Sequence, residues 1–279
     1  MLIFAIFLLH KSIYYKQYFT LIIVLLQNTF LMKYLFKKAI FALGCVLFCV
    51  LAPINKLLAI SNTYFFEKPT TPITIPYTPT DYENVVFKLY DSLQLNFYGC
   101  SVQAFEYAMQ GYNMLYNTGQ LAKQIISIID FTKPSFEKRL FVLDVQQMKI
   151  LFTTYVAHGQ GSGQAMATAF SNVPESYKSS LGFYKTASTY FGKNGFSLKL
   201  LGLEKGVNDK AAERSIVMHG APYVSQTIID AQGFLGRSQG CPAVPQKLSK
   251  PIIDKIKEGS CLFIYSNNNK YLTHSAMLH

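Results

Sequence analysis

The hydrophobic residues of this chain are concentrated in its first 60 positions, which limits the part that can fold as a globular domain. Half of the 279 residues are hydrophobic. Residues 1–60 hold the apolar runs IFAIFLL, FTLIIVLLQNTFL and AIFALGCVLFCVLAPI. About 220 residues of ordinary globular composition remain, enough for one domain with an extension.

The segment that starts at Met32 has the pattern of a secretory signal peptide. Three lysines precede an apolar stretch, residues 39–52, and a small residue, Ala52 or Ala59, can mark the cleavage site. Residues 1–31 are then an upstream extension.

A second interpretation keeps the N-terminus as a membrane anchor. Phe19–Leu31 and Ala39–Ile54 are both apolar, although each is shorter than the roughly 20 residues that span a bilayer comfortably. Both interpretations export the rest of the chain to the periplasm or cell envelope, and the second anchors it in the inner membrane.

Export changes what the cysteines can do. Cys45 and Cys49 lie in the targeting segment, which leaves Cys100, Cys241 and Cys261 in an oxidising compartment. An odd number means that one thiol stays free or pairs between chains. A Cys100–Cys261 disulfide is one option that the sequence leaves open.

The chain is basic, with a formal net charge of +11. We expect no nucleic-acid partner, because no RNP, helix-turn-helix or zinc-finger pattern accompanies the charge. For an exported protein, an anionic wall polymer or a membrane surface is the more natural partner. A basic surface without a specific partner is an equally good explanation.

After the hydrophobic N-terminus (1–60), the chain divides into segments that differ in composition and in hydrophobic pattern. Residues 61–80 are rich in proline and threonine and predict an extended linker. A helical segment is expected over 81–133, with Asp81 as the cap of its first helix. The apolar positions of that helix recur at spacings of three and four: Val85, Val86, Leu89 and Leu93.

Two further helices are expected in this segment. Ser101–Asn117 has one apolar face and ends at Asn117-Thr118-Gly119. Leu121–Ile129 is interpreted as a third, short helix.

Residues 134–268 have the pattern of a mostly β domain with small helices. RLFVLDVQQMKILFTTYVAHG predicts a hairpin that turns at Gln146-Gln147, and FSLKLLG, RSIVMHG and SCLFIYS predict later strands. Ser249–Lys257 predicts a short helix with proline near its first turn. Residues 269–279 form a C-terminal tail.

One histidine and one cysteine in this domain could act together. His219 ends an apolar strand and precedes a glycine, so it can face a cleft, and Cys241 lies in the loop GRSQGCPAVP. A nearby imidazole promotes the reactive thiolate of a cysteine. Gly240 lets its own amide and that of Cys241 point at a developing oxyanion. A structural role for both residues remains the alternative.

Other chemistry has weaker support. His158, His219, Cys241 and Cys261 are elements that bind zinc, but no C-x2-C or H-x3-H pair is present. The segment HGQGSGQ lacks the GK[ST] of a phosphate-binding loop and is best interpreted as a tight turn. The aromatic residues of Ser171–Phe196 could stack on a substrate, although such residues more often pack.

SIVMHGAPYVS followed by GRSQGCPAV resembles the active-site segment of the murein L,D-transpeptidase catalytic-domain family. The family signature is His-Gly, then roughly fifteen to twenty residues, then Ser/Thr-x-Gly-Cys. DFTKPSFEKRLFVLDV, TYVAHGQGSG and GSCLFIYS are also similar to one branch of the family, and the likeness runs from about Asp81 to Ser266.

The chain departs from the broader family in three ways. Gln239 stands where the family usually has His before Gly-Cys. Pro242-Ala243 stands where it often has Asn or Arg after the cysteine. The gap of 18 residues between His219 and Ser238 is slightly longer than is usual in the family. These departures leave the choice between transpeptidation, carboxypeptidation and another peptidoglycan cleavage open.

The resemblance implies a role for each matching residue. Cys241 would attack the carbonyl of the third stem-peptide residue and expel the terminal D-alanine, with His219 as general base. The Gly220 carbonyl would orient the imidazole, and the amides of Gly240 and Cys241 would form the oxyanion hole. Three side chains would line the cleft: Tyr223, Arg237 and Ser238. His158 has no role in this scheme and is expected to be a hydrogen-bonded structural residue.

We therefore expect an α+β protein: a mainly β, β-sandwich-like catalytic domain preceded by a helical segment and a hydrophobic export segment. The expected function is that of a peptidoglycan L,D-transpeptidase that acts on stem peptides without a metal or an organic cofactor. The alternatives are an L,D-carboxypeptidase or endopeptidase, and an inactive wall-binding protein.

Overall fold

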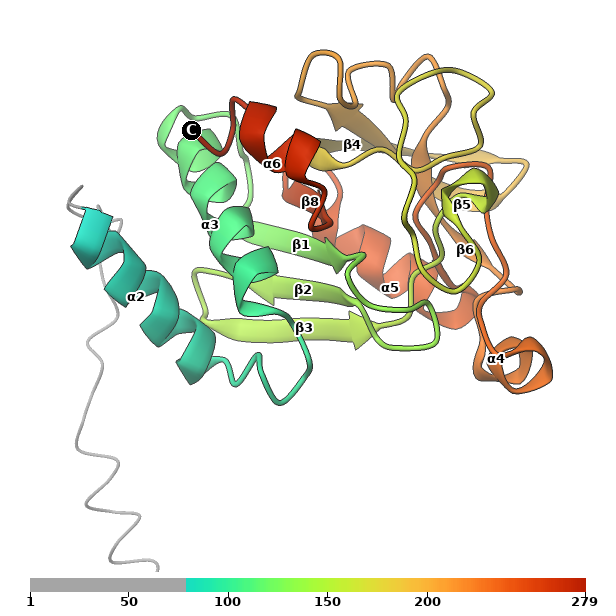
Figure 1. The fold of residues 1–279 in the computed structure, drawn as a ribbon, viewed down its shortest axis with the longest axis horizontal. Helices are drawn as coiled ribbons and strands as arrows, with labels where there is room; N and C mark the ends of the chain where they lie inside the picture. Colours follow the sequence, from blue (N-terminus) through green and yellow to red (C-terminus); the bar gives the residue numbers. More distant parts are fainter. Residues whose placement is uncertain (1–78) are drawn as a thin grey trace, which may run out of the picture. The chain divides into compact units, whose positions relative to one another are not determined.

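The computed structural model describes residues 79–279, which belong to one compact unit, Thr74–His279 (Figure 1). The predicted export segment, and all of the linker but its last two residues, lie outside the described residues. Within residues 79–279, no helix is long and apolar enough to cross a membrane.

Two helices precede the sheet, α2 (Pro79–Ser92) and α3 (Val102–Asn117). The prediction that Asp81 caps the first helix was wrong, because the helix already begins at Pro79; the fixed φ of proline suits a first helical position. Helix α3 is confirmed, and the Ser101 hydroxyl caps it by accepting a hydrogen bond from the Ala104 amide at 3.3 Å. In Figure 1, α3 lies across the strands at the β1 side of the sheet.

The third predicted helix, Leu121–Ile129, was wrong. Residues Ile125–Asp130 form strand β1, which pairs in parallel with β8 (Cys261–Tyr265) and antiparallel with β2 (Leu140–Asp144). Positions 126–130 are all buried. A strand covered on both faces is a continuous apolar run without alternation, and such a run is easily mistaken for a buried helix.

One eight-stranded sheet forms the core, in the order β3-β2-β1-β8-β4-β5-β6-β7. The predicted hairpin is confirmed as β2 and β3 (Lys149–Thr154), and the predicted later strands are confirmed as β5 (Gly195–Gly202), β6 (Val217–Ala221) and β8. Strand β4 (Gly182–Gly192), which pairs with β5 and β8, was not predicted. The second half of this strand is mostly exposed and contains polar residues, so it lacks the apolar run by which the other strands were predicted.

A single sheet replaces the expected β-sandwich. Its two edge strands nearly meet: Ala157, just after β3, forms an antiparallel bridge with Ala243 of β7 (Ala243–Pro245). The Ala157 amide donates to the Ala243 carbonyl at 2.8 Å. Strand twist explains how a continuous sheet of this size can curl until its ends approach. The mainly β character is confirmed, but two stacked sheets are not present among the described residues.

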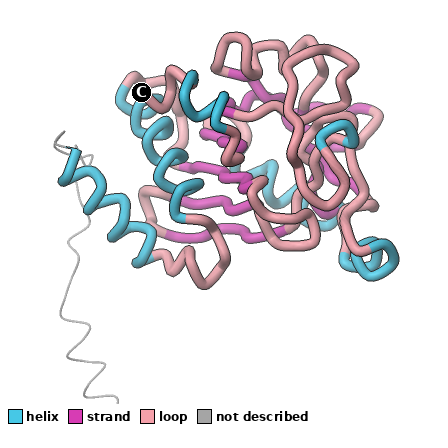
Figure 2. The backbone as a smooth tube through the Cα atoms, in the orientation of Figure 1, coloured by secondary structure: helices cyan, strands magenta, loops and turns pink. Residues whose placement is uncertain are grey.

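The remaining helices are short. Helix α5 (Gln246–Ile256) begins three residues before the predicted start, so that Pro251 lies inside it. Helix α4 (Gln226–Gln232), the 3-10 turn η1 (Gln160–Ser162) and α6 (Asn269–His274) were not predicted. Long loops cover the side of the sheet near β5 and β6 (Figure 2).

The C-terminal tail is anchored by a buried carboxylate. Glu204 accepts hydrogen bonds from the Phe183 amide at 2.6 Å and from the Tyr271 hydroxyl at 3.1 Å, and Ser275 also donates to it. Burial raises the pKa of Glu204, and these three donors oppose that rise. Residues that sequence reasoning treated as a tail are thereby fixed to the sheet.

Candidate active site

The candidate histidine and cysteine are on neighbouring parallel strands. His219 lies in β6, where its Cα is paired with that of Ala243 in β7. Cys241 lies two residues before Ala243, in the loop that enters β7. The register therefore brings the two residues to adjacent positions of one sheet edge, separated by about 7 Å along the strand direction.

His219 is held by one ring nitrogen. Its Nδ1 lies 3.0 Å from the Gly220 carbonyl oxygen. A carbonyl only accepts, so Nδ1 carries the proton and Nε2 carries the lone pair of a neutral imidazole. Burial lowers the pKa of His219, against the opposing effect of the Gly220 carbonyl. The ring is therefore a neutral base at neutral pH.

The Cys241 side chain is 8% exposed and points toward the start of β6. Its Sγ accepts from the Val217 amide at 3.5 Å and donates to the Ser215 carbonyl at 3.6 Å. Burial raises the pKa of this thiol, while the Val217 amide and the charge of Arg214 oppose the rise. Among residues 79–279, no hydrogen bond joins the thiol to His219, so contact between them requires a rotation of the Cys241 side chain.

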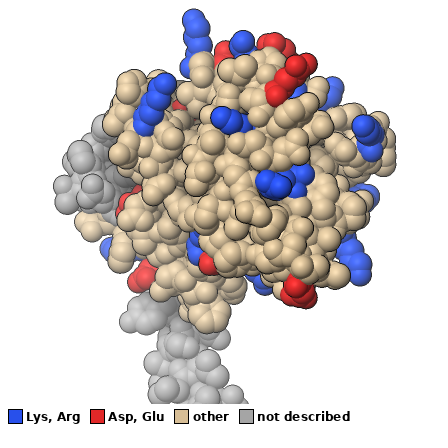
Figure 3. Space-filling view, turned by 45° about the vertical axis from the view of Figure 1, so that its right-hand side comes forward, with Lys and Arg blue, Asp and Glu red and all other residues tan. Residues whose placement is uncertain are grey.

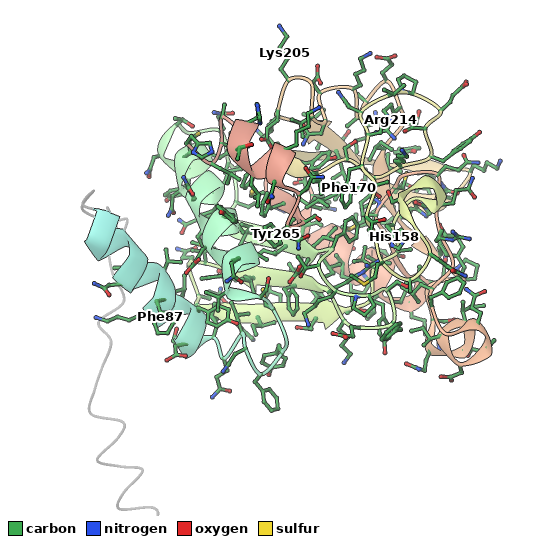
Figure 4. All side chains as sticks on the ribbon, in the orientation of Figure 1. Phe87, His158, Phe170, Lys205, Arg214 and Tyr265 are labelled. Carbon is green, nitrogen blue, oxygen red and sulfur yellow. The ribbon has the colours of Figure 1, made fainter. Side chains whose placement is uncertain are left out.

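Arg214 is a site residue that sequence reasoning missed. Its guanidinium donates to the Ser171 carbonyl at 2.8 Å, to the Ser180 hydroxyl at 2.6 Å and to the Lys178 carbonyl at 2.6 Å. Figure 4 places Arg214 in the part of the molecule that contains β5 and β6. These bonds fix a positive charge near Cys241. No short-range pattern marks it, because its partners are more than 30 residues away in the sequence.

Ser238 organises the cysteine loop. Its hydroxyl donates to the Cys241 carbonyl at 2.6 Å and accepts from the Gly240 amide at 3.0 Å. The Gly240 amide, expected to point at an oxyanion, is therefore already engaged. The Cys241 amide has no acceptor among the residues that the structure describes. One of the two expected oxyanion donors is thus free and the other is held by a side chain.

The segment that begins at His158 is linked to this loop by hydrogen bonds. The His158 carbonyl accepts from the Ser238 amide at 3.0 Å, and the Gly159 amide donates to the Ser179 hydroxyl, which donates on to the Gly240 carbonyl at 3.2 Å. A Cβ at Gly159 would lie 2.3 Å from the Tyr177 carbonyl oxygen and 2.9 Å from the Gly240 Cα. Only glycine allows this approach, so HGQGSGQ is a scaffold for the cysteine loop as well as a turn.

His158 is buried and bonded at both ring nitrogens. The Arg139 guanidinium donates to Nδ1 at 2.7 Å, and Nε2 lies 3.3 Å from the Gly163 carbonyl. Arginine cannot accept, so Nδ1 is the acceptor and Nε2 carries the only proton. Burial, and then the positive charge of Arg139, lower the pKa of His158 to about 4. In Figure 4, His158 lies within the loops near β5 and β6.

Arg139 is one of the largest fully buried side chains among the described residues. It is fully buried and donates to the carbonyls of Val156 and Lys133 at 2.8–3.1 Å, and its guanidinium carbon lies 4.7 Å from the centre of the Phe131 ring. Burial lowers the pKa of Arg139 to about 9, so it remains charged at neutral pH.

Two of the three residues predicted to line a cleft, Arg237 and Tyr223, are at least partly exposed. Arg237 is exposed and donates to the Gly163 carbonyl at 3.0 Å. Tyr223 is half-buried, and burial, followed by the charge of an ionised Cys241, raises its pKa to about 12. Ser238, in contrast, is buried and fully occupied by the loop.

The four residues considered for zinc do not form one cluster. Among residues 79–279, no group of three or more His, Cys, Asp or Glu side chains could hold a metal ion. Cys100 and Cys261 are both buried free thiols, so the optional disulfide between them is not formed. The aromatic residues of 171–196 divide in two: Phe183 and Tyr184 are fully buried packing, whereas Phe191 is 82% exposed.

Comparison with solved structures gives weak likenesses. The chain is similar to an L,D-transpeptidase from Mycobacterium smegmatis (11% identity, 51% of this chain and 59% of that chain, TM-score 0.32) and to an L,D-transpeptidase from Stackebrandtia nassauensis (12%, 68% and 80%, 0.32). It is also similar to the helical cell shape determining protein Pgp2 from Campylobacter jejuni (14%, 58% and 57%, 0.36). The chain thus spans less than two thirds of the first of these proteins.

No curated protein matches the chain in sequence. A family model does match, over residues 97–265, which is more than half of the chain; its description is L,D-transpeptidase catalytic domain. Members of this family act on peptidoglycan in the cell envelope. The match includes β6, the cysteine loop and the His158 segment. The chain therefore belongs to the L,D-transpeptidase catalytic domain family.

Proposed function

We propose that this protein is an exported cysteine acyltransferase that works as a peptidoglycan L,D-transpeptidase. The observation that carries the proposal is the state of His219, which lies on the strand next to the Cys241 loop. Its neutral imidazole is bonded through Nδ1 to the Gly220 carbonyl, and its Nε2 has no hydrogen-bond partner among residues 79–279. A nucleophile needs such a base within reach of its proton.

The reaction begins with rotation of the Cys241 side chain away from Ser215. His219 Nε2 then takes the thiol proton, and the thiolate attacks the carbonyl of the third stem-peptide residue. The imidazolium returns its proton to the leaving amine, so that D-alanine departs and a thioester remains. An amine of a neighbouring stem peptide attacks the thioester and releases the cross-linked product and the free thiol.

The negative charge of the tetrahedral intermediate is stabilised by the amide of Cys241. The amide of Gly240 becomes a second donor when its bond to the Ser238 hydroxyl is given up. Arg214 favours the thiolate through its fixed charge. Tyr223 and Arg237 line the approach to the thiol, and no cofactor takes part.

Transfer to water, which would make the protein a carboxypeptidase, uses the same groups. The test incubates the full chain in mild detergent with a disaccharide-tetrapeptide, and analyses the products by mass spectrometry beside a Cys241→Ala control. A cross-linked dimer that is missing in the control supports the transpeptidase. Tripeptide alone supports the carboxypeptidase.

An inactive wall-binding protein is the remaining alternative. It predicts no turnover and no covalent adduct between a carbapenem and Cys241. Such a result in a folded protein would overturn the proposal and make the buried thiol a packing residue.

A further inference from the structure

An open pocket lies away from the cysteine, between the turn that follows α2 and the outer edge of the sheet. Its volume is about 510 Å³. It is lined by Phe97 and Tyr98 of the turn, by Lys138, and by residues 150–153 of edge strand β3. In Figure 1, the connection between α2 and α3 runs alongside β3. The volume falls in the range of small-molecule sites.

The turn presents its aromatic rings to solvent and holds them there. Phe97 is 83% exposed and Tyr98 is 44% exposed, with ring centres 5.5 Å apart in an edge-on arrangement. The Phe97 amide donates to the Gln94 carbonyl at 3.0 Å, and Leu95 beside it is fully buried. An anchored turn that exposes large apolar rings is typical of a binding surface.

The opposite wall carries a cation. Lys138 forms no salt bridge within residues 79–279. The pocket thus combines aromatic faces with a positive charge. A pyranose ring matches this combination, because its C–H face can lie on an aromatic ring while its rim presents oxygen atoms.

The position of the pocket fits a sugar that carries a stem peptide. Along the chain, Thr153 is four residues from Ala157, which is bonded to Ala243 two residues beyond Cys241. The extended path from Thr153 to the level of the thiol is at most about 20 Å. The lactyl group and three amino acids that join a sugar to the reacting carbonyl reach about 14 Å when extended. The ring itself accounts for most of the remainder.

We propose that this pocket binds a pyranose ring of the glycan strand, and so selects stem peptides that are still attached to sugar. The inference rests on the proposed function and names the substrate class more closely. Ring stacking on Phe97 and Tyr98 supplies most of the affinity, and Lys138 donates hydrogen bonds to oxygen atoms at the rim of the sugar.

The test measures binding, not turnover, in full-length protein that carries Cys241→Ala. Three ligands are titrated: a disaccharide-tetrapeptide, the same tetrapeptide without sugar, and an oligomer of N-acetylglucosamine. Phe97→Ala is compared with Phe191→Ala, which removes a ring of nearly equal exposure (82% against 83%) at the tip of the β4–β5 hairpin. Thermal unfolding of both variants checks that each is folded.

We expect Phe97→Ala to weaken the sugar-containing ligands about tenfold, with little change in the binding of the free tetrapeptide. Phe191→Ala should bind all three ligands like the parent. Equal sugar affinity in both variants would overturn the proposal. So would an equal loss of free tetrapeptide binding in Phe97→Ala, which would make the pocket a peptide site.

This result can be separated from the fate of the proposed function. If the protein with an intact Cys241 shows no turnover but the oligosaccharide binds in a Phe97-dependent way, the sugar site stands and the enzymatic proposal fails. If turnover occurs and no sugar binding depends on Phe97, the enzymatic proposal stands and the sugar site fails.

Discussion

Two histidine-glycine pairs, His158-Gly159 and His219-Gly220, lie in this molecule in very different surroundings. Both imidazoles are buried, and burial lowers the pKa of each. His158 is bonded at both ring nitrogens, whereas His219 has a hydrogen-bond partner among residues 79–279 for Nδ1 alone. The comparison shows that the unused lone pair, not burial or a shifted pKa, separates a potential base from a structural histidine.

The two histidines also differ in what their backbones do. The His158 carbonyl accepts from the Ser238 amide and so supports the loop of Cys241. His219 lies in a regular strand beside that loop. The region of His158 therefore affects the site through the position of the loop, whereas the role proposed for His219 is proton transfer.

The largest expected effect separates these roles by substitution. His219→Asn should lower turnover of the disaccharide-tetrapeptide by about 10²–10⁴-fold with little change in melting temperature. His158→Asn should lower the melting temperature, while turnover per folded molecule stays within about tenfold. Steady-state kinetics and thermal unfolding of both variants measure the two effects. The reverse pattern would show that the base has been assigned to the wrong histidine.

The next effect concerns the support of His158. Arg139→Met leaves the Val156 carbonyl, the Lys133 carbonyl and His158 Nδ1 without their donor. Unpaired buried groups cost about 1–3 kcal/mol each, so we expect a loss of about 3–5 kcal/mol in the free energy of unfolding. Denaturant titration measures it, with exposed Arg237→Met as the matched control, which should change stability by no more than about 0.5 kcal/mol. An equal loss of unfolding free energy in both variants would show that the buried guanidinium contributes no more to stability than an exposed one.

A pH experiment follows from the same pair of groups. The pKa of His158 falls to about 4 in the folded protein, from an ordinary value of 6.5. Between these values the unfolded chain binds a proton that the folded chain does not, so stability falls as the pH drops from about 6.5 to about 4. The shift corresponds to about 3 kcal/mol.

We expect the dependence of unfolding free energy on pH to be shallower in His158→Asn than in the parent over this interval. Titration of the imidazole signals by NMR provides the independent measurement. A His158 signal that titrates near 6.5 in the folded protein would contradict the buried, doubly bonded state.

The smallest expected effect concerns the electrostatics of the thiol. Arg214 lowers the pKa of Cys241, so Arg214→Gln should raise it and slow alkylation of the thiol at a given pH. The pH profile of alkylation by a neutral reagent measures this effect. Arg214→Lys, which keeps the charge, is the matched control and should lie between the parent and Arg214→Gln. A profile that does not move in Arg214→Gln would exclude an electrostatic role.

The distribution of surface charge does not mark a binding site. On the face shown in Figure 3, lysine and arginine side chains are spread over the surface without forming one large patch. The excess of basic residues was visible in the sequence, but its arrangement depends on the fold. This distribution fits a basic surface of general character better than a nucleic-acid footprint on that face.

Much of the site could be predicted because its signals are local. Strand β6, the hairpin of β2 and β3, and the loop around Cys241 are each marked by short patterns of apolar, glycine and proline residues. Helix α3 was equally clear from its period and its serine cap. The family resemblance carried the assignment of roles to His219 and Cys241.

What could not be predicted depends on distant partners. Strand β1 looks helical until β8, more than 100 residues later, covers its edge. Arg139 and Arg214 are ordinary surface-type residues in sequence, and only the folded chain supplies the carbonyls that hold them. The hydrogen bond from the Gly240 amide to the Ser238 hydroxyl depends on the conformation of the loop, which the spacing of residues does not determine.

The place of β8 in the sheet has a consequence for when the protein can fold. This strand inserts between β1 and β4, although its residues, 261–265, come after all the other strands in sequence. A ribosome must therefore synthesise the chain through residue 265 before the centre of the sheet can close, and pairing across such sequence distances is slow. The proposed Cys241 site, which lies on the same sheet, is therefore expected to be completed late in folding.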